Sequence, residues 1–138
     1  MFSLDEVDAF ATALPDVSVG ARWGNRTWFV RAGSRDVGFA WERPLNKADI
    51  KRWGDAPLPT DPILGLRVAD LNEKEAILAA NTKAFFTIAH FDNYAAVLIE
   101  LSKAAKKDVR EALVDAWLCC APKKLASEYL ESTRRKRS

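Results

Sequence analysis

The sequence has few of the residues that most enzymes use for chemistry. It contains one histidine, His90, and two cysteines, Cys119 and Cys120. A zinc site would need carboxylates, or cysteines from a different element, to complete its ligands, so we predict no metal and no other cofactor. The signatures of dinucleotide-binding folds, phosphate-binding loops, zinc proteases and serine hydrolases are also absent. We therefore expect a protein that is not an enzyme.

Long apolar runs and an export signal are missing as well. The most apolar stretch, Tyr94 to Leu101, is much shorter than the roughly 18 to 20 residues that span a bilayer, and Met1 to Leu14 begins with acidic residues. Adjacent cysteines make a strained bridge, so we predict that Cys119 and Cys120 are reduced thiols packed at a helix end. These features predict a cytoplasmic protein without membrane contact. The glycosylation pattern Asn25-Arg26-Thr27 is then a coincidence.

The length and composition predict one folded domain. A chain of 138 residues with 49% hydrophobic residues is near the most common domain size, and no internal repeat or linker interrupts it. We place this domain at residues 1–131. Residues 132–138 include Arg134-Arg135-Lys136-Arg137 and are predicted to be a disordered basic tail.

Several segments show helical spacing together with helix-ending signals. Ser3 and Glu6 match a capping box, and the apolar positions that follow repeat at helical spacing up to Leu14, before Pro15. Asn46 is expected to cap a short helix with Ile50 and Trp53 inward. Further helices are predicted from Asp70 to about Ala80, from Lys106 to Leu118, and from Pro122 to about Leu130.

An antiparallel hairpin is predicted from alternating residues on both sides of a Gly33-Ser34 turn. This turn pairs Arg31 with Asp36 and Trp28 with Phe39, and it lets the ring of Phe29 cover Gly38. The expected core face consists of Trp28, Val30, Val37, Phe39 and Trp41.

Other strands extend this hairpin into a sheet. A strand near Val17 to Arg22 is expected to join it through a Gly24-Asn25 turn, and another is expected at Leu64 to Ala69. Ala84 to Ala89 and Tyr94 to Leu101 read as a second hairpin, although the second of these runs could instead be helical. The predicted fold class is α+β, with an antiparallel sheet packed against helices.

Positive charge gathers in one segment. The net charge is only +2, but residues 22–52 hold eight basic residues against Asp36, Glu42 and Asp49. Counterion release requires a coherent basic surface, so we predict that this segment contacts nucleic acid phosphates, helped by the basic tail. The candidate binding residues are Arg22, Arg26, Arg31, Arg35, Arg43, Lys47, Lys51 and Arg52. The alternative is that these charges only protect exposed strands from aggregation.

His90 has two interpretations. It could act as a general base that Asp92 orients, or its ring could simply bond to a turn carbonyl. We favour the structural interpretation.

The order of several short motifs resembles the MmcQ/YjbR family. The similarity runs from about Ser3 to Ala121, and its motifs indicate fold rather than activity. They are Leu14-Pro15-Asp16, Trp23-Gly24, Thr27-Trp28-Phe29-Val30, Val68-Ala69-Asp70-Leu71, Phe85-Phe86-Thr87, His90-Phe91-Asp92-Asn93-Tyr94, Val97-Leu98-Ile99-Glu100-Leu101 and Ala116-Trp117. This chain has Asn93 and Ala95 where family members often carry glycine and proline, which leaves the type of that turn open.

The resemblance implies a two-layer, CyaY-like α+β domain whose hairpins act as wings, and hence a DNA-binding role. It carries over no catalytic residue. Three hypotheses follow for the function: a small nucleic-acid-binding or regulatory domain, a protein-interaction module or homo-oligomer that uses the sheet face around Phe29, and a small-molecule binder with a cleft at Trp23, Trp53 or His90.

Overall fold

A six-stranded antiparallel sheet organises the fold in the computed structural model, which describes residues 2–81 and 83–137. The strands are β1 (Val17–Arg22), β2 (Asn25–Ala32), β3 (Arg35–Glu42), β4 (Ile63–Arg67), β5 (Phe85–Phe86) and β6 (Ala96–Glu100), in the spatial order β1-β2-β3-β4-β6-β5. The helices are α1 (Leu4–Thr12), α2 (Lys47–Trp53), α3 (Leu71–Ala80), α4 (Lys106–Cys120) and α5 (Lys123–Arg137), with the 3₁₀ turns η1 (Ala89–Phe91) and η2 (Leu101–Lys103). The predicted α+β class is confirmed.

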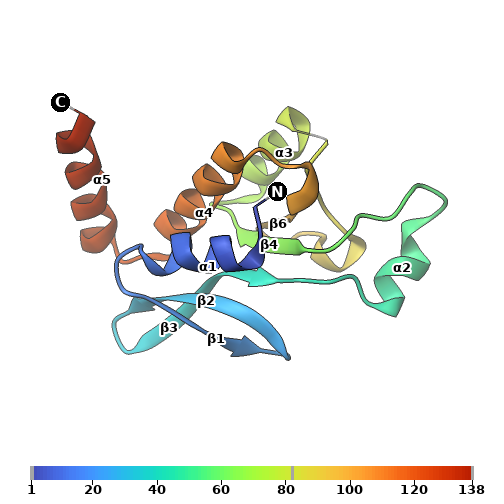
Figure 1. The fold of residues 1–138 in the computed structure, drawn as a ribbon, viewed down its shortest axis with the longest axis horizontal. Coiled ribbons are helices and arrows are strands. Elements are labelled where there is room, and N and C mark those ends of the chain that lie inside the picture. Colours follow the sequence, from blue (N-terminus) through green and yellow to red (C-terminus); the bar gives the residue numbers. More distant parts are fainter. Residues whose placement is uncertain (1, 82, 138) are drawn as a thin grey trace.

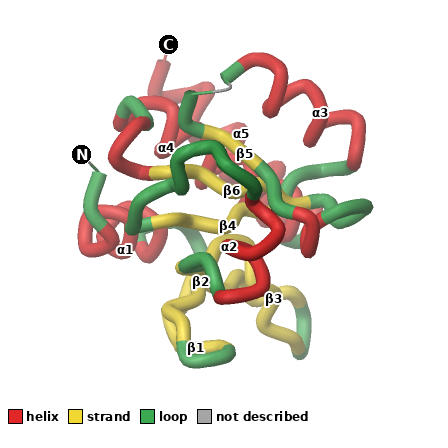
Figure 2. Tube along the Cα trace, turned by 90° about the vertical axis from the view of Figure 1, so that its right-hand side faces the viewer, coloured by secondary structure: helices red, strands yellow, loops and turns green. Residues whose placement is uncertain are grey.

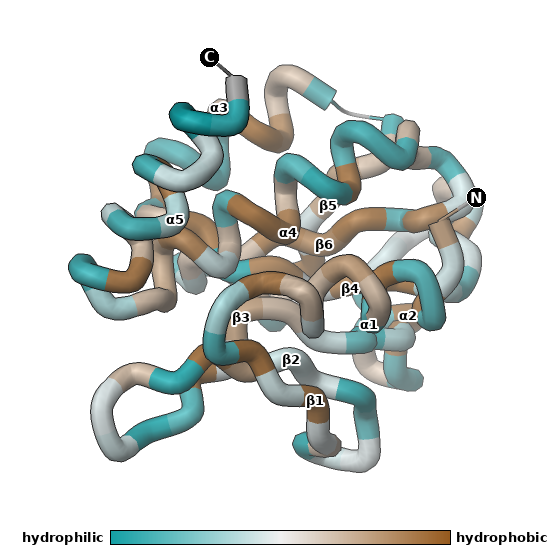
Figure 3. Tube along the Cα trace, turned by 60° about the vertical axis from the view of Figure 1, so that its left-hand side comes forward, coloured by the Kyte–Doolittle hydropathy of each residue, from teal (hydrophilic) through white to brown (hydrophobic). Residues whose placement is uncertain are grey.

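The two faces of the sheet are covered differently. The main core lies under α1, α3 and α4, where Trp28 and Trp117 are fully buried. Both indole groups keep a hydrogen bond, because Trp28 Nε1 donates to Asp8 at 2.9 Å and Trp117 Nε1 donates to the Pro15 carbonyl at 3.0 Å. A smaller cluster on the other face includes Ile63 and Phe91 and is covered by α2 and η1. Figure 3 shows the hydrophobic residues of β4, β6 and α4 gathered between the layers.

The strands β1, β2 and β3 extend beyond the helices. Figures 1 and 2 show this part of the sheet reaching away from α3 and α4, and five of the six residues of β1 are exposed. One side of this extension is therefore open to solvent.

Local signals predicted the helix starts correctly. Ser3 and Glu6 form the reciprocal capping box of α1, and Asn46 forms another with Asp49 at α2. Asp70 caps α3 by accepting a hydrogen bond from the Glu73 amide at 2.8 Å. Cys119 and Cys120 are free thiols at the end of α4, as predicted. In α2, however, Ile50 is 46% exposed, because the buried Asp49 binds Arg43 and turns the helix accordingly.

The main hairpin departs from the prediction at one point. The pairs Arg31 with Asp36 and Phe29 with Gly38 form as expected, but Trp28 lies opposite Ala40 because a β-bulge shifts the register. The extra residue lets Phe39 and Ala40 both face the main core. The predicted pair of Trp28 with Phe39 is therefore wrong.

The same bulge moves Trp41 out of the predicted core face. Trp41 pairs with Thr27 and contacts the smaller cluster on the opposite side of the sheet. Its ring lies over Gly65, where an added Cβ would be 2.5 Å from Trp41 Nε1. An uninterrupted alternation in the sequence could not predict this change of side.

Three other regions differ from the prediction. The β1–β2 turn is Trp23-Gly24 rather than Gly24-Asn25, with φ values of 57° and 77°. The second hairpin forms between β5 and β6, but η1 occupies much of its connection. Residues 132–137, predicted as a disordered tail, continue α5 instead. Ion pairs of Glu131 with Arg134 and Arg135 join successive turns of this helix, while position 138 lies outside the described residues.

Candidate functional site

A cleft of about 720 Å³ lies on the open side of the sheet. Its walls come from the β1–β2 turn, the ends of β3 and β4, the segment before α2, and the turn that begins with η1. Its size is within the roughly 300–1,000 Å³ that ligand pockets usually have. Its lining contains both charged and aromatic side chains.

Aromatic rings form its floor and part of its rim. The ring of Trp41 lies 6.3 Å from that of Phe91 and 6.5 Å from that of Tyr94, and Phe91 and Tyr94 meet edge to face at 5.4 Å. Phe91 is buried, whereas Tyr94 is 40% exposed. A planar ligand could therefore reach the Tyr94 ring while the other two rings support it.

Trp23 adds a second exposed ring at the tip of the β1–β2 turn. It is 92% exposed, and its φ of 57° is in the left-handed region that a bulky residue occupies only at a cost. Neither packing nor backbone preference explains a tryptophan here. Such a residue is a candidate for ligand contact.

Four arginines line the same cleft. Arg43 is neutralised by the buried Asp49 at 2.9 Å. Among the described residues, Arg22, Arg35 and Arg67 form no ion pair. The cleft therefore keeps three unneutralised guanidinium groups.

Arg67 has the most unusual surroundings of the four. Its guanidinium lies 5.6 Å from the centre of the Tyr94 ring, and its Nε is buried without a hydrogen-bond partner. An unsatisfied buried donor costs about 1–3 kcal/mol.

A lysine holds the aromatic turn in place. The buried Lys74 of α3 donates from Nζ to the carbonyls of Phe91 at 2.6 Å and Tyr94 at 2.8 Å. Desolvation lowers the pKa of this amine, although the charge of Asp92 opposes the change. Asn93, between the two carbonyls, has φ 61°, a conformation that asparagine tolerates in place of glycine. With Asp92 at φ −58° and ψ 133° and Asn93 at φ 61°, this is a type II turn, the type that the sequence left open.

The structure divides the eight predicted binding residues. Arg22, Arg35 and Arg43 line the cleft. Arg26 pairs with Asp5 of α1 at 3.4 Å, and Arg31 pairs with Asp36 at 3.2 Å. The other three, which lie on α2 outside the cleft, are Lys47, Lys51 and Arg52.

Sequence reasoning missed Arg67, Trp41 and Tyr94 as site residues. Trp41 was placed on the core face, and the other two come from segments that carry no local charge excess. Their pairing depends on β3, β4 and η1 meeting in space, which no short sequence pattern reports.

His90 also lines the cleft, 6.1 Å from the Phe91 ring. Among the described residues, the His90 ring makes no hydrogen bond to Asp92 or to a turn carbonyl, so neither arrangement predicted for it is formed. In residues 2–81 and 83–137, no three His, Cys, Asp or Glu side chains are grouped so that they could hold a metal ion.

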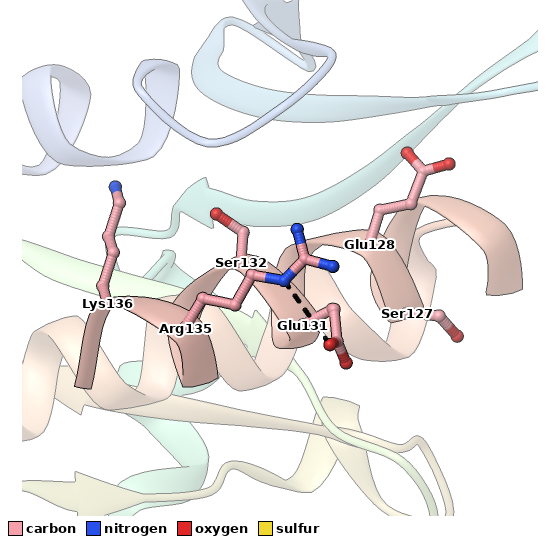
Figure 4. Close-up of a pocket in the computed structure, with 6 residues that line it drawn as sticks. All are labelled: Ser127, Glu128, Glu131, Ser132, Arg135 and Lys136. Atoms are coloured by element: carbon pink, nitrogen blue, oxygen red, sulfur yellow. Dashed lines mark ion pairs between the residues drawn. The ribbon is translucent and has the colours of Figure 1, made fainter. Parts of the chain in front are cut away.

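Other hollows are less suitable as a site for this cationic chemistry. A depression of about 690 Å³ along α5 is lined by that helix alone, and Figure 4 shows Arg135 paired with Glu131 there at 3.6 Å.

None of the described helices has the length and apolar character needed to cross a membrane.

Comparison with known proteins gives relatives of the same length class. The uncharacterised proteins Rv2570 of Mycobacterium tuberculosis and Mb2600 of Mycobacterium bovis are each 41% identical over 98 residues, which cover 69% of this chain and 75% of the relative. The chain belongs to the same family as these mycobacterial proteins. No protein-family model matches it.

A solved structure has the same fold. It is the Deinococcus radiodurans protein DR2400, described with a DUF419 domain, and it superposes with a TM-score of 0.62 over 84% of this chain and 76% of that one. At 18% identity this likeness supports the architecture alone.

Proposed function

We propose that the domain binds nucleotide units of single-stranded nucleic acid in the cleft. Arg22, Arg35 and Arg67 contact phosphate, and a base stacks on the ring of Tyr94 or Trp23. The observation that carries the proposal is the presence of two exposed aromatic rings beside three guanidinium groups without an acidic partner. Basic grooves with stacking rings are how proteins bind single strands without sequence preference.

A single strand fits these contacts better than a duplex. Bases in a duplex are stacked on each other and offer their faces to no protein ring, whereas unstacked bases can enter a concave site. Two cations of the wing that would grip duplex phosphates, Arg26 and Arg31, also make exposed ion pairs with Asp5 and Asp36, which partly offset their charge. We therefore still propose a nucleic-acid ligand, but it is a single strand in place of a duplex, and Arg22, Arg35 and Arg67 bind it in place of the eight predicted cations.

The role proposed here is binding without catalysis. We also propose that the chain is a member of the MmcQ/YjbR family. The sequence motifs that resemble this family and the fold shared with the DUF419 protein support this membership. The aromatic turn at residues 90–94, one of those motifs, forms one wall of the cleft.

The test is a titration of fluorescently labelled DNA followed by anisotropy. A 12-nucleotide single strand should bind at least tenfold more tightly than the matching duplex, and its affinity should fall with salt. Arg67→Gln should weaken binding and reduce the salt slope by about 0.7, the value for one phosphate contact on a single strand. Tyr94→Ala should cost about 1–3 kcal/mol of binding, through loss of base stacking.

Arg110 of α4 provides the matched control. It is exposed and makes no ion pair among the described residues, so Arg110→Gln removes the same charge far from the cleft. Equal effects of Arg67→Gln and Arg110→Gln would show only nonspecific charge attraction. Saturation by a mononucleotide with the affinity of the 12-mer would instead assign a small-molecule site.

A further inference from the structure

Helix α5 is poorly covered by the rest of the chain. The helix begins after Ala121-Pro122, which separate it from α4, and Figure 1 shows it projecting from the edge of the molecule. Leu125 and Tyr129 anchor it, with the Tyr129 ring 5.0 Å from that of Trp117. The helix is about 22 Å long at 1.5 Å per residue, and none of residues 123–136 is fully buried.

One side of α5 combines an apolar residue with cations. Leu130 is 53% exposed. Helical spacing places it in line with Lys123, Ala126 and Arg134, at intervals of three, four and four residues. We refer to Lys123, Ala126, Leu130 and Arg134 as the outer stripe. The anchoring residues Leu125 and Tyr129 lie on a neighbouring side, so the outer stripe does not cover the main core.

A groove with a volume of about 710 Å³ lies between α3, α4 and the sheet, and its charged residues are mainly acidic, opposite in sign to those of the outer stripe. Its floor is apolar and includes Leu66, Val68, Ile77, Phe85, Val97 and Leu118. Its rim carries four carboxylates, those of Glu73, Asp108, Glu111 and Asp115. We call this the acidic groove.

The carboxylates of the rim outnumber the positive charge beside them, because Arg67 is the one cation among the described residues that line the groove, against four carboxylates. Burial, followed by the charges of Glu111 and Glu73, raises the pKa of Asp115. Glu111 pairs with Lys107 at 3.9 Å, but both side chains are exposed and the pair contributes little. A cation brought to this rim would relieve the repulsion among its carboxylates.

We propose that the outer stripe of α5 docks in the acidic groove of a second copy of this chain. Leu130 enters the apolar floor while Lys123 and Arg134 face the rim carboxylates, and Arg134 exchanges its exposed pair with Glu131 of its own helix for a rim carboxylate. Lys123 and Arg134 bracket Leu130 along one side of the helix, so the stripe matches a groove that is apolar in the middle and acidic at its edges. The two surfaces are complementary in both hydrophobicity and charge.

The position of the Ala121-Pro122 hinge between α4 and α5 explains why α5 docks in the groove of a partner and not in its own. The groove reaches Leu118 and Cys119 near the end of α4, directly before the Ala121-Pro122 hinge. Leu125 and Tyr129 hold α5 against Trp117, which keeps the outer stripe off its own groove. In a two-fold pair each helix leaves its own body beside the groove of the other, and both stripes are covered in a closed dimer.

The test is light scattering of the full chain over about 5–300 μM protein. The wild type should rise from 15.4 kDa toward twice that mass. Leu130→Asp should raise the dimer dissociation constant at least tenfold. The paired reversals Glu111→Lys with Asp115→Lys in the groove, and Lys123→Glu with Arg134→Glu in α5, should each weaken the dimer similarly.

Charge restoration distinguishes this interface from any other. The chain carrying all four reversals should regain at least half of the lost association, because the complementarity is restored with opposite signs. Lys124→Glu reverses one lysine charge about 100° around α5 from Lys123, outside the outer stripe, and should leave the dimer unchanged. A mass of 15.4 kDa at every concentration, or a dimer that is indifferent to these variants, overturns the proposal. Circular dichroism of each variant checks that the helical content of the chain is unchanged.

Discussion

The β1–β2 turn offers a substitution that should separate folding from function. In Trp23→Asn, the tryptophan at φ 57° is replaced by the residue that most often precedes glycine in this kind of two-residue turn. A bulky residue in the left-handed region costs about 1–2 kcal/mol, much of which asparagine avoids.

The packing lost in this variant is small. Because Trp23 is 92% exposed, only roughly 20 Å² of a side chain of about 200 Å² is covered. At about 25 cal/mol per Å², this burial contributes about 0.5 kcal/mol. The free energy of unfolding should therefore rise by about 0.5–1.5 kcal/mol, and Tm should rise by about 2–6 °C.

Single-strand binding should change in the opposite direction. Loss of one stacking ring should weaken the affinity by about 1–3 kcal/mol, or roughly 5- to 150-fold. Trp23→Phe is the control, because it keeps both an aromatic ring and the strained backbone and should therefore keep most of the affinity without a gain in stability. Urea unfolding and anisotropy measure the two quantities on the same samples.

Two results would refute this reasoning. A decrease in the free energy of unfolding on Trp23→Asn would mean that the indole packs in solution and has a structural role. A rise in stability with unchanged affinity would remove Trp23 from the binding site.

Two further predictions concern the packing that supports the site. Gly65→Ala should lower the free energy of unfolding by about 1–3 kcal/mol in urea, because the new Cβ collides with the Trp41 ring at 2.5 Å; unchanged stability with unchanged Trp fluorescence would contradict this close contact. Burial raises the pKa of Glu100, but hydrogen bonds from Thr60 and the charge of Lys103 outweigh it, so the pKa lies below its usual value. This stabilisation is present above the unfolded pKa, near 4.5, and is lost as the pH falls through the folded pKa. In thermal unfolding, the stability advantage of the wild type over Glu100→Gln should therefore shrink below about pH 4.5. Parallel curves of stability against pH for the two proteins would contradict this prediction.

Helix caps and turns were readable in the sequence because they depend on neighbours in the chain. Ser3 finds its partner Glu6 three residues away, and Asn46 finds Asp49 at the same distance. The pairing of Phe29 with Gly38 followed from the two-residue turn between their strands. Such contacts close within a few residues, so composition and spacing are enough to predict them.

The side on which Trp41 lies was not readable in this way. Alternation of apolar residues continues through the hairpin, but the bulge at Phe39 inserts one residue and reverses the side of everything beyond it. The bulge lets Phe39 and Ala40 share one core, a gain that depends on how α4 packs over the sheet. Packing between distant segments therefore decided this position.

The charged residues illustrate the same limit. A count along the chain grouped eight cations at 22–52, yet an acid from α1 holds Arg26 and an acid from α2 holds Arg43. The cleft instead gains Arg67 from β4, forty-five residues after Arg22.

By itself the sequence determined where helices begin, where the β2–β3 turn lies, and that one α+β domain forms, because these depend on short-range hydrogen bonds and on apolar periodicity. Only the tertiary structure decided which arginines keep an available charge, which rings meet them, and which side of α5 is left uncovered. Those outcomes depend on the burial and electrostatic pairing of residues far apart in the chain, and these interactions exist only once the layers have packed.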